Sequence, residues 1–518
     1  MKGIRIFGCL VFFGFALSCT CEANLCSENR CLDGQVCKDG VCLPLCSLGE
    51  SVCYGRCVDT KVNPDHCGSC GVSCETTVLI SGAMRVGDSA NDMINGLVSD
   101  SLGNVYVTGQ FGGSVSFGRI KLTASNTSVF VAKITPKGKW EWAVSVQGSS
   151  VSVGRGIVID KARNLFVVGS FQNRVVFGQT VLSSLGYNDV FVAKITPKGE
   201  WGWVVAAGGE VSTDEGQSIA IDAMGDLYIT GSFQGSASFG QTQLTSFGEK
   251  DIFVSKIDSN GQWLWARAAG GPDDDEGHSI AVDALGDVYV TGFFLGEARF
   301  GELVLWDASQ KAGVFVVKVS TKGEWKWSRK SGGTAYAYGQ SIVVDPTGFA
   351  YLTGVFRGGH VTFGTTQLAG LGEDDIFVAK ISLDGRWEWA LQAGGSMVDK
   401  GHQVALDGTG SIYLTGAFSG AASFGEKRFV SDGGFDVFIS KINPVGHWLW
   451  VEHLRGVSHD EGGALSVGVG GNVHVAGYFR ERLHAGDIRF DNVGSQDGFV
   501  VTLQQNTQPC LAGTCQWR

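Results

Sequence analysis

The polar residues best able to do chemistry recur at matching positions along the chain. One recurring position is mostly acidic, and its members are Asp92, Asp214, Asp275, Asp399 and Asp460, with Ser152 and Ala337 at the two other places. A second position is mostly polar, and its members are Asn95, Arg155, Gln217, His278, Gln340, His402 and Gly463. Amides, imidazoles and a guanidinium offer hydrogen bonds to a polar ligand such as a glycan. We therefore predict that the first six members of the second series form a ligand-binding ring.

The acidic positions have two interpretations. An Asp in a loop is commonly a turn cap, because its carboxylate accepts hydrogen bonds from nearby backbone N–H groups. The alternative is calcium, which takes roughly six to eight oxygen ligands. The densest run predicts a calcium site formed by Asp273, Asp274, Asp275 and Glu276. The sequence has no Asp-x-Asp-x-Asp-Gly loop, and no cofactor other than calcium is expected.

No catalytic residue can be assigned from a motif. The nine histidines are scattered, and the sequence has no Gly-x-Ser-x-Gly, His-Glu-x-x-His or phosphate-binding glycine loop. An enzyme would need a convergent set of catalytic groups that breaks the repeat. A polysaccharide hydrolase or lyase that uses loop carboxylates as acid and base therefore remains the less favoured alternative.

These positions belong to an internal repeat. A Thr-Gly-x-Phe type motif places its Gly at Gly109, Gly169, Gly231, Gly292, Gly354, Gly416 and Gly477. A Trp-x-Trp motif begins at Trp140, Trp201, Trp263, Trp325, Trp387 and Trp448, with spacings of 61 or 62 residues. Each copy has four short apolar runs separated by Gly, Asp, Ser and Asn, which predicts a four-stranded antiparallel unit.

The repeated Trp residues and one repeated Lys are predicted to be framework residues. A buried Trp covers about 150–250 Å² and suits packing between units. The Lys belongs to a Phe-Val-Ala-Lys type motif, at Lys133, Lys194, Lys256, Lys318, Lys380 and Lys441. Their fixed place in each copy favours a structural role over a ligand-stacking surface.

The two ends of the repeat region complement each other. The last copy stops at Leu503 without its Trp-x-Trp strand, and residues 77–84 have the pattern of a fourth strand that lacks the first three. Pairing them would close a ring and remove exposed sheet edges. The sequence therefore predicts an all-β fold, a seven-bladed β-propeller of four-stranded blades closed by an N-terminal strand.

The repeat resembles the SBBP family of bacterial β-propeller repeats. The resemblance rests on Ser-Ile-Ala-Val-Asp, Val-Tyr-Val-Thr-Gly, Phe-Gly, Asp-Ile-Phe-Val-Ala-Lys-Ile and Trp-x-Trp-Ala, and it covers residues 76–502. It implies a secreted or surface propeller and brings no catalytic residues. The last copy departs from the pattern, with Ala485-Gly486 in place of Phe-Gly and Thr502 in place of Lys.

The N-terminus predicts export. Lys2 and Arg5 precede an apolar run from Ile6 to Leu17, which is too short to span a membrane. The sequence Ala16-Leu17-Ser18-Cys19 resembles the lipobox of bacterial lipoproteins, although Ala16 stands where Leu is usual. Acylation of Cys19 and cleavage near Ala23 therefore remain open alternatives. The protein is expected at the outer membrane or cell surface as a lipoprotein, or as a secreted protein.

The cysteines cluster outside the repeat. The chain has fifteen, and none lies between Cys74 and Cys510. Residues 24–74 are poor in large apolar residues, and small exported segments of this kind usually depend on disulfides. The predicted disulfide cysteines are Cys26, Cys31, Cys37, Cys42, Cys46, Cys53, Cys57, Cys67, Cys70, Cys74, Cys510 and Cys515. The part around Cys67-Gly68-Ser69-Cys70-Gly71 resembles the Stig1-like cysteine-rich motif, while zinc is the alternative use of these thiols.

Composition limits the partners. The net charge is −11 and there is no basic cluster, so nucleic acid is excluded as an expected partner. The predicted organisation is a signal peptide (1–23), a cysteine-rich module (24–74), a propeller (75–505) and a tail (506–518). The predicted function is a monomeric scaffold that binds a polysaccharide or a cell-surface protein, with membrane contact only through a lipid anchor. A purely structural surface component is a further alternative.

Overall fold

The computed structural model describes residues 35–38, 41–44, 51–53, 56–58, 76–210 and 213–507. The chain divides into two compact units, of which one is Thr77–Asn506 and the other comprises Met1–Thr76 and Thr507–Arg518. In the smaller unit, β1 (Gln35–Lys38) pairs with β2 (Val41–Pro44), and β3 (Ser51–Cys53) pairs with β4 (Arg56–Val58). The predicted signal sequence, Cys19 and the disulfides fall on residues or side chains outside the described part.

The larger unit is built from antiparallel strands, and groups of four recur along it. The first strands of these groups are β6 (Met93–Ser99), β12 (Ser152–Ile159), β18 (Glu215–Ile221), β22 (Glu276–Val282), β29 (Tyr336–Val344), β35 (Asp399–Leu406) and β39 (Glu461–Val467). The second strands are β7 (Val105–Phe111), β13 (Leu165–Phe171), β19 (Leu227–Phe239), β23 (Val288–Phe294), β30 (Ala350–Arg357), β36 (Ile412–Phe424) and β40 (Val473–Phe479). The second strand lies between the first and the third in each group.

The third strands are β10 (Ser128–Ile134), β16 (Asp189–Ile195), β20 (Thr242–Ile257), β26 (Gly313–Val319), β33 (Asp374–Ile381), β37 (Lys427–Ile442) and β43 (Asp497–Thr507). The fourth strands are β11 (Trp140–Ser145), β17 (Trp201–Ala207), β21 (Trp263–Ala269), β27 (Trp325–Lys330), β34 (Trp387–Gly395), β38 (Trp448–Gly456) and β5 (Thr76–Val86). Two of the groups are linked through β34 and β36 into one ten-stranded sheet that also includes β41 (Arg482–Ala485) and β42 (Ile488–Asp491).

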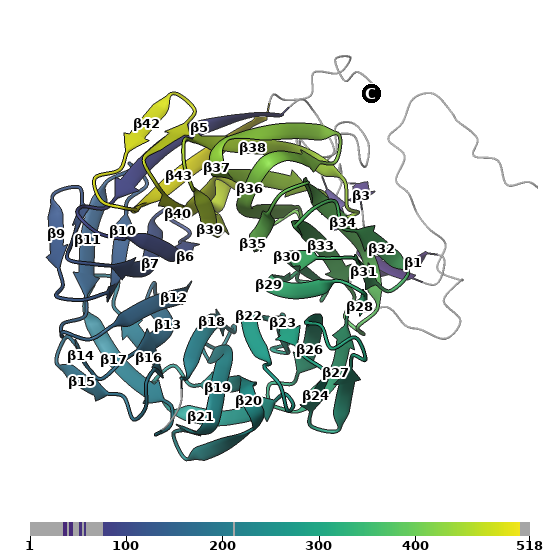
Figure 1. The fold of residues 1–518 in the computed structure, drawn as a ribbon, viewed down its shortest axis with the longest axis horizontal. Coiled ribbons are helices and arrows are strands. Elements are labelled where there is room, and N and C mark those ends of the chain that lie inside the picture. The colour runs from purple at the N-terminus through teal and green to yellow at the C-terminus, as the bar shows by residue number, and fades with distance from the viewer. Residues whose placement is uncertain are drawn as a thin grey trace, which may run out of the picture. The chain divides into compact units, whose positions relative to one another are not determined.

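The first strands lie side by side around a common centre, as Figure 1 shows. Each contacts the next one along the chain, and β39 contacts β6. We call them the inner strands. The Trp-bearing strands are the outermost of the four strands in each group, so this part of the prediction is confirmed.

The strand β5 occupies the place of the missing fourth strand. The last sheet has the order β39-β40-β43-β5, so residues 76–86 pair with the end of the repeat region. Arg85 forms an ion pair with the buried carboxylate of Asp497 across this pairing. Val86 also packs with Ile94 and Val500 in one apolar cluster. The predicted position of the N-terminal strand is therefore confirmed.

The apolar core lies between neighbouring sheets. Each buried cluster combines residues of two consecutive groups; Tyr228 and Ile252, for example, pack with Val290 and Phe315. The alternating apolar pattern allows this, because both faces of each sheet are covered by its neighbours. The first Trp of each Trp-x-Trp motif packs on a Phe; Trp201, for example, lies 5.1 Å from Phe177 between ring centroids.

The second Trp joins one sheet to the next. Its indole N–H donates a hydrogen bond to a backbone carbonyl of the following repeat, at 3.0–3.2 Å. The residues that make this contact are Trp142, Trp203, Trp265, Trp327 and Trp389. These contacts confirm that the Trp residues belong to the framework.

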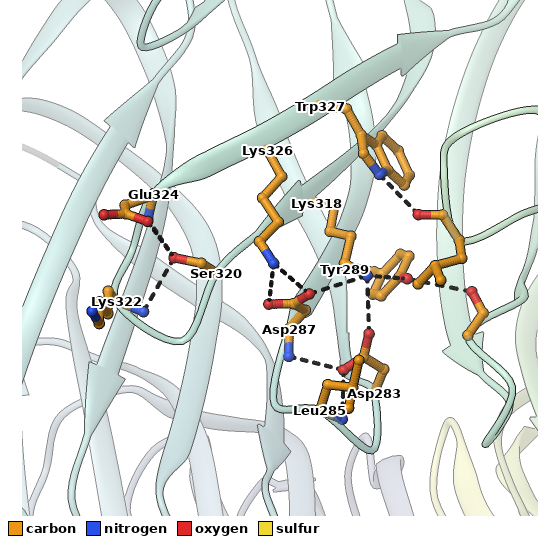
Figure 2. Close-up of polar contacts among 12 residues, drawn as sticks. Asp283, Leu285, Asp287, Tyr289, Lys318, Ser320, Lys322, Glu324, Lys326 and Trp327 are labelled. Carbon is orange, nitrogen blue, oxygen red and sulfur yellow. Dashed lines mark hydrogen bonds and ion pairs between the residues drawn. The ribbon is translucent and has the colours of Figure 1, made fainter. Parts of the chain in front are cut away.

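The repeated Lys is also structural. Lys318 lies in a buried network, shown in Figure 2, in which its Nζ is 3.0 Å from Asp283 Oδ2 and 2.7 Å from the Tyr289 hydroxyl. Asp287 lies 3.2 Å from the same Nζ. The network ties together the first, second and third strands of one sheet.

The connections between second and third strands carry structure of their own. In five repeats they form a small hairpin: β8 (Ser114–Phe117) with β9 (Ile120–Thr123), β14 (Arg174–Phe177) with β15 (Thr180–Ser183), β24 (Glu297–Phe300) with β25 (Leu303–Trp306), β31 (His360–Phe363) with β32 (Thr366–Ala369), and β41 with β42. In the other two, the strands themselves are extended. The sequence predicts only a longer connection here. No helix of the described residues is long and apolar enough to cross a membrane.

Candidate ligand-binding site at the central cavity

A β-bulge interrupts every inner strand at the same place. The register of pairing with the second strand shifts at Asn95, Arg155, Gln217, His278, Gln340, His402 and Gly463. A bulge leaves one residue unpaired and re-aims its side chain. The unpaired residues are the members of the predicted polar series, which we call the polar ring.

The bulge depends on the Gly of the Thr-Gly-x-Phe motif. A Cβ on Gly292 would lie 1.9 Å from the carbonyl oxygen of Glu276, and a Cβ on Gly231 would lie 1.8 Å from that of Glu215. The equivalent glycines Gly109, Gly169, Gly354, Gly416 and Gly477 stand within 2.0 Å of the matching carbonyl. Any side chain at these positions would push the first strand away. The repeated Gly therefore permits the close approach that forms the bulge.

The polar ring lines one cavity. A hollow of about 160 Å³ is bounded by residues of all the inner strands, and it includes each member of the polar ring. This central cavity holds on the order of five water molecules, at about 30 Å³ each. Pockets that enclose a whole small ligand are usually about 300–1,000 Å³. The volume of the central cavity therefore suits one chemical group of a larger ligand that binds at the mouth of the cavity.

Hydrogen bonds run from one inner strand to the next. Asn95 donates to the carbonyl of Gly154 at 2.9 Å, and His278 Nδ1 lies 2.8 Å from the carbonyl of Gly339. Deeper in the cavity, the Ser279 hydroxyl accepts a hydrogen bond from the Ile342 backbone N–H at 3.1 Å. The ring residues are held by neighbouring strands, which pre-organises their polar atoms.

Three carboxylates stand beside the polar ring, and each pairs with a basic side chain. Glu215 lies 3.2 Å from Arg155, Glu276 lies 3.1 Å from Lys250, and Glu461 lies 3.0 Å from His402. The hydrogen bond from His278 is the largest influence on Glu276 and, with Lys250, holds the pKa of that carboxyl at about 2. The pKa of Glu461 is likewise held at about 2, so Glu276 and Glu461 are ionised at neutral pH and cannot act there as a general acid.

The acidic series lies elsewhere. Asp92, Asp214, Asp275, Asp399 and Asp460 are buried at the junctions between sheets. Each accepts hydrogen bonds from backbone N–H groups; Asp275 Oδ1, for example, accepts from Leu295 at 3.0 Å and Asp460 Oδ1 from Arg480 at 2.9 Å. These contacts agree with the turn-cap interpretation, because the carboxylates satisfy loop backbone.

The four residues predicted to bind calcium are not brought to one point. Asp275 faces the buried junction, and Glu276 bonds Lys250. Asp274 accepts a hydrogen bond from the Lys250 backbone at 3.3 Å, and Asp273 is exposed. Within the described ranges, no group of three or more His, Cys, Asp or Glu residues could hold a metal ion. Calcium at these residues stays a prediction without support from their geometry.

A larger hollow, of about 460 Å³, lies away from the polar ring. It is bounded by β25, β27 and the start of β34, and it includes the exposed Trp306 beside Arg329 and Lys330. Equivalent ends of the hairpins carry Thr123, Ser183 and Ala369. Sequence analysis missed this groove, although Trp306 breaks the repeat pattern and could have signalled it.

Comparison with known proteins identifies the repeat. The family model described as "SBBP: Beta-propeller repeat" matches residues 264–292, which include most of β21, all of β22 and most of β23. A curated relative, the uncharacterized WD repeat-containing protein L264 of Acanthamoeba polyphaga mimivirus, is 21% identical over 434 residues. The chain is a β-propeller repeat protein.

The propeller repeats match only part of each curated relative. The alignment with the mimivirus protein covers 69% of this chain and 31% of the relative. The regulatory protein FlaEY of Caulobacter vibrioides is 25% identical over 275 residues, which cover 49% of this chain and 28% of FlaEY. The chain thus spans less than a third of the length of these relatives.

The solved structures that resemble this chain have low TM-scores. A protein of unknown function from Bacteroides caccae has a TM-score of 0.35 and 13% identity, covering 67% of this propeller chain and 93% of its own. Sqt1 from Chaetomium thermophilum has a TM-score of 0.39 and 9% identity, covering 83% and 100%. Likenesses at this level carry no argument about the function of this propeller.

Proposed function

We propose that this protein is an exported binding scaffold whose propeller recognises a polysaccharide at the mouth of the central cavity. The observation that carries the proposal is the coincidence of the seven bulges with the polar ring. The framework residues repeat, whereas the bulged position varies between amide, imidazole, guanidinium and glycine. Side chains that differ from repeat to repeat at the bulged position, which lines the cavity, suit recognition of a ligand without sevenfold symmetry.

The proposed architecture is a seven-bladed propeller closed by β5. Two contacts support the closure: the apolar cluster that joins Ile94 to Ala476, and the hydrogen bond between the Ser99 and Ser466 hydroxyls at 2.9 Å. Both join the first blade to the last. A closed ring would hold the polar ring at fixed spacing, which limits the conformational entropy lost on binding.

Polysaccharide is the proposed ligand class because the cavity is small and polar. Sugar hydroxyls both donate and accept, which matches the side-chain amides of Gln217 and Gln340. The Gln340 side chain makes no hydrogen bond to the part of the chain that the structure describes, so its amide is available to a ligand. The basic side chains at and beside the cavity, Arg155, His402 and Lys250, are already paired with carboxylates, which disfavours a strongly anionic ligand.

The alternative of a polysaccharide hydrolase or lyase has less support. Such an enzyme needs an accessible carboxyl group whose pKa is raised so that it can donate a proton. Burial raises the pKa of Glu461, but the hydrogen bond and charge of His402 and Lys400 outweigh it and hold the value at about 2. The Asp residues with raised pKa, such as Asp275, are buried at the blade junctions, and Glu452, whose pKa burial also raises, lies on the outer strand β38 away from the central cavity.

The proposal also includes export, either with a lipid on Cys19 or by free secretion, and a cysteine-rich module before the propeller. A purely structural surface role would leave the polar ring without a ligand. Binding to soluble polysaccharide distinguishes the two roles.

The test is binding of dextran, laminarin and alginate to the full-length mature protein, followed by calorimetry with any binder. Gln340→Ala and Arg155→Ala should weaken binding at least tenfold, whereas Lys322→Ala, an exposed change at the opposite end of a blade, should not. If only Trp306→Ala weakens binding, the outer groove is the site and the proposed location is wrong. If none of the polysaccharides binds, the proposed ligand class is wrong.

A further inference from the structure

A second acidic position faces the acidic series across the blade junctions. It stands at or near the start of the third strand, and its members are Asp189, Asp251, Asp375, Asp436 and Asp497, with Ser128 and Gly313 at the two other places. The backbone N–H of the loop position bonds the carbonyl just before the strand position. Asp275, for example, donates to Lys250 and Asp460 donates to Phe435. The two acidic positions are therefore neighbours across each junction.

The two positions change together within this one chain. Asp189, Asp251, Asp375, Asp436 and Asp497 face Asp214, Asp275, Asp399, Asp460 and Asp92, respectively. Where the strand position is Ser128, the loop position is Ser152, and where it is Gly313, the loop position is Ala337. Two independent turn caps would have no reason to be lost as a pair. The covariation indicates that the two carboxyl groups act on each other.

The geometry is clearest beside Gly270. A Cβ on this glycine would lie 2.0 Å from Asp251 Oδ1 and 2.9 Å from Asp275 Oδ2, so both oxygens border the same point. Both side chains are fully buried, and neither of these two oxygens has a hydrogen bond of normal geometry among the described residues, although the backbone N–H of Gly271 lies near both carboxyl groups and lowers the pKa of each. The remaining oxygens accept from the backbone of Phe247 and Leu295. One unsatisfied oxygen of each carboxyl group thus faces the other.

A second junction also places an oxygen of each carboxyl group around one point. A Cβ on Gly394 would lie 2.5 Å from Asp375 Oδ1 and 2.9 Å from Asp399 Oδ2. Asp375 Oδ1 is buried without a hydrogen-bond partner within the described ranges, whereas Asp399 Oδ2 accepts from the Gly395 backbone at 2.7 Å and Asp399 Oδ1 accepts from that of Ser419.

The charged groups around the first pair do not neutralise it. Lys250 pairs with Glu276 at 3.1 Å, and Arg299 pairs with Glu297 at 2.5 Å. Asp273 and Asp274 in the same loop add negative charge. Two carboxylates that are buried together without a cation cannot both be ionised at low cost.

The second pair likewise lacks a cation of its own. Asp374, next to it, lies 3.8 Å from Arg357, and Lys400 pairs with Glu461. Gln392 offers Asp375 a neutral hydrogen bond. Two further junctions differ, because Arg85 pairs with Asp497, and His453 lies 2.6 Å from Asp436.

We propose that Asp251 with Asp275, and Asp375 with Asp399, are proton-binding sites in which two buried carboxyl groups share one proton at neutral pH. The proton lies between the facing oxygens, so that one group donates an O–H hydrogen bond and the other accepts it. A calcium ion would need roughly six to eight oxygens, and each junction offers two facing ones. At the first junction the proton satisfies both oxygens that lack a partner. At the second it satisfies Asp375 Oδ1, while Asp399 Oδ2 also accepts from the Gly395 backbone.

The pKa values agree with this assignment. Burial raises the pKa of Asp275 to about 8, and the charge of Asp251 adds to the rise. Burial likewise raises the pKa of Asp399 to about 7 and that of Asp251 to about 6. A group whose folded pKa is raised binds its proton more tightly in the folded state. Stability is therefore fully present near pH 4 and declines as the pH rises towards 8.

The test uses Asp275→Asn in the full-length protein, with Asp273→Asn in the same loop as the exposed control. The amide is neutral at every pH and can donate its N–H to Asp251, so the variant should fold. Infrared spectra of the native protein at pH 6 should show the carbonyl band of a protonated carboxyl group. The band should weaken in Asp275→Asn, stay unchanged in the control, and weaken in the parent protein above pH 8.

Thermal unfolding provides the second readout. The melting temperature of the parent protein should fall from pH 5 to pH 8.5, and Asp275→Asn should lose part of this dependence while the control keeps it. Three results would overturn the proposal. The first is an infrared spectrum at pH 6 with only ionised carboxylate bands, and the second is an unchanged pH dependence of the melting temperature in Asp275→Asn. The third is a melting temperature that rises with CaCl₂ and falls with EDTA in the parent protein but not in Asp275→Asn. The last result would assign the junction to calcium instead.

Discussion

His402 Nε2 lies 3.0 Å from Glu461 Oε2, so a polar-ring residue of one inner strand is tied to the carboxylate that begins the next. Lys400 approaches the other oxygen of the same carboxylate at 2.9 Å. The carboxylate is mostly buried, so removing its charge leaves the Lys400 ammonium and the His402 imidazole without their charged acceptor. This link therefore combines a structural role with the positioning of His402 at the central cavity.

Glu461→Gln should destabilise the protein by about 1–3 kcal/mol at pH 7, because buried donors lose a charged acceptor. The folded pKa of Glu461, about 2, lies below the usual 4.5. Its contribution is therefore present above about pH 4.5 and is lost as the pH falls towards 2. Denaturant melts at pH 7, 4.5 and 3 should show the difference from the parent shrinking. Glu200→Gln, at an exposed position, should show no difference at any pH.

Lys318→Met should be more damaging. Lys318 is buried with Asp283 and Tyr289, and without the ammonium group Asp283 becomes an uncompensated buried charge. Breaking one side of a buried ion pair typically costs about 3–5 kcal/mol. Lys326, which reaches Asp287 from a half-exposed position, is the matched control, and Lys326→Met should cost less than about 1 kcal/mol. Equal losses in chemical denaturation would show that burial of the network does not determine its contribution.

The sequence predicts the strands well because their apolar pattern is set by burial on both faces. It also places the polar ring, since Asn95 and its equivalents share one position in the repeat. It does not predict the bulge, because the signal lies in another strand: the bulge depends on the close approach of Gly109 to the Met93 carbonyl, which the repeat pattern alone does not reveal.

The paired carboxyl groups are missed for a different reason. Asp251 and Asp275 are 24 positions apart in the chain, and each alone looks like a turn cap. Their joint replacement by Ser128 with Ser152 is visible in the sequence, but only a comparison of two repeat positions would find it. The hairpins between second and third strands depend on contacts with the neighbouring blade, such as Gln147 with Val176, which a single repeat does not contain.

Gly292→Ala should disturb folding and binding together. The new methyl group would lie 1.9 Å from the Glu276 carbonyl, so the bulge that aims His278 must shift. Overpacking of this kind costs about 1–3 kcal/mol. Gly408→Ala, where a Cβ meets nothing within 4 Å, should be neutral. Thermal melts measure the first effect, and calorimetry with the polysaccharide ligand measures the second. A stable Gly292→Ala protein with unchanged affinity would contradict the role given to the bulge.

Arg85→Ala should test the closure of the ring. The guanidinium pairs with Asp497, whose carboxylate is fully buried beside Asp92. Loss of the cation leaves buried negative charge at the junction between β5 and β43, which should cost about 3–5 kcal/mol. Arg119→Ala, on an exposed turn, is the control. Hydrogen exchange should show faster exchange in β5 and β43 before other strands. If Arg85→Ala is as stable as Arg119→Ala and β5 keeps its protection, this ion pair does not hold the N-terminal strand in the ring.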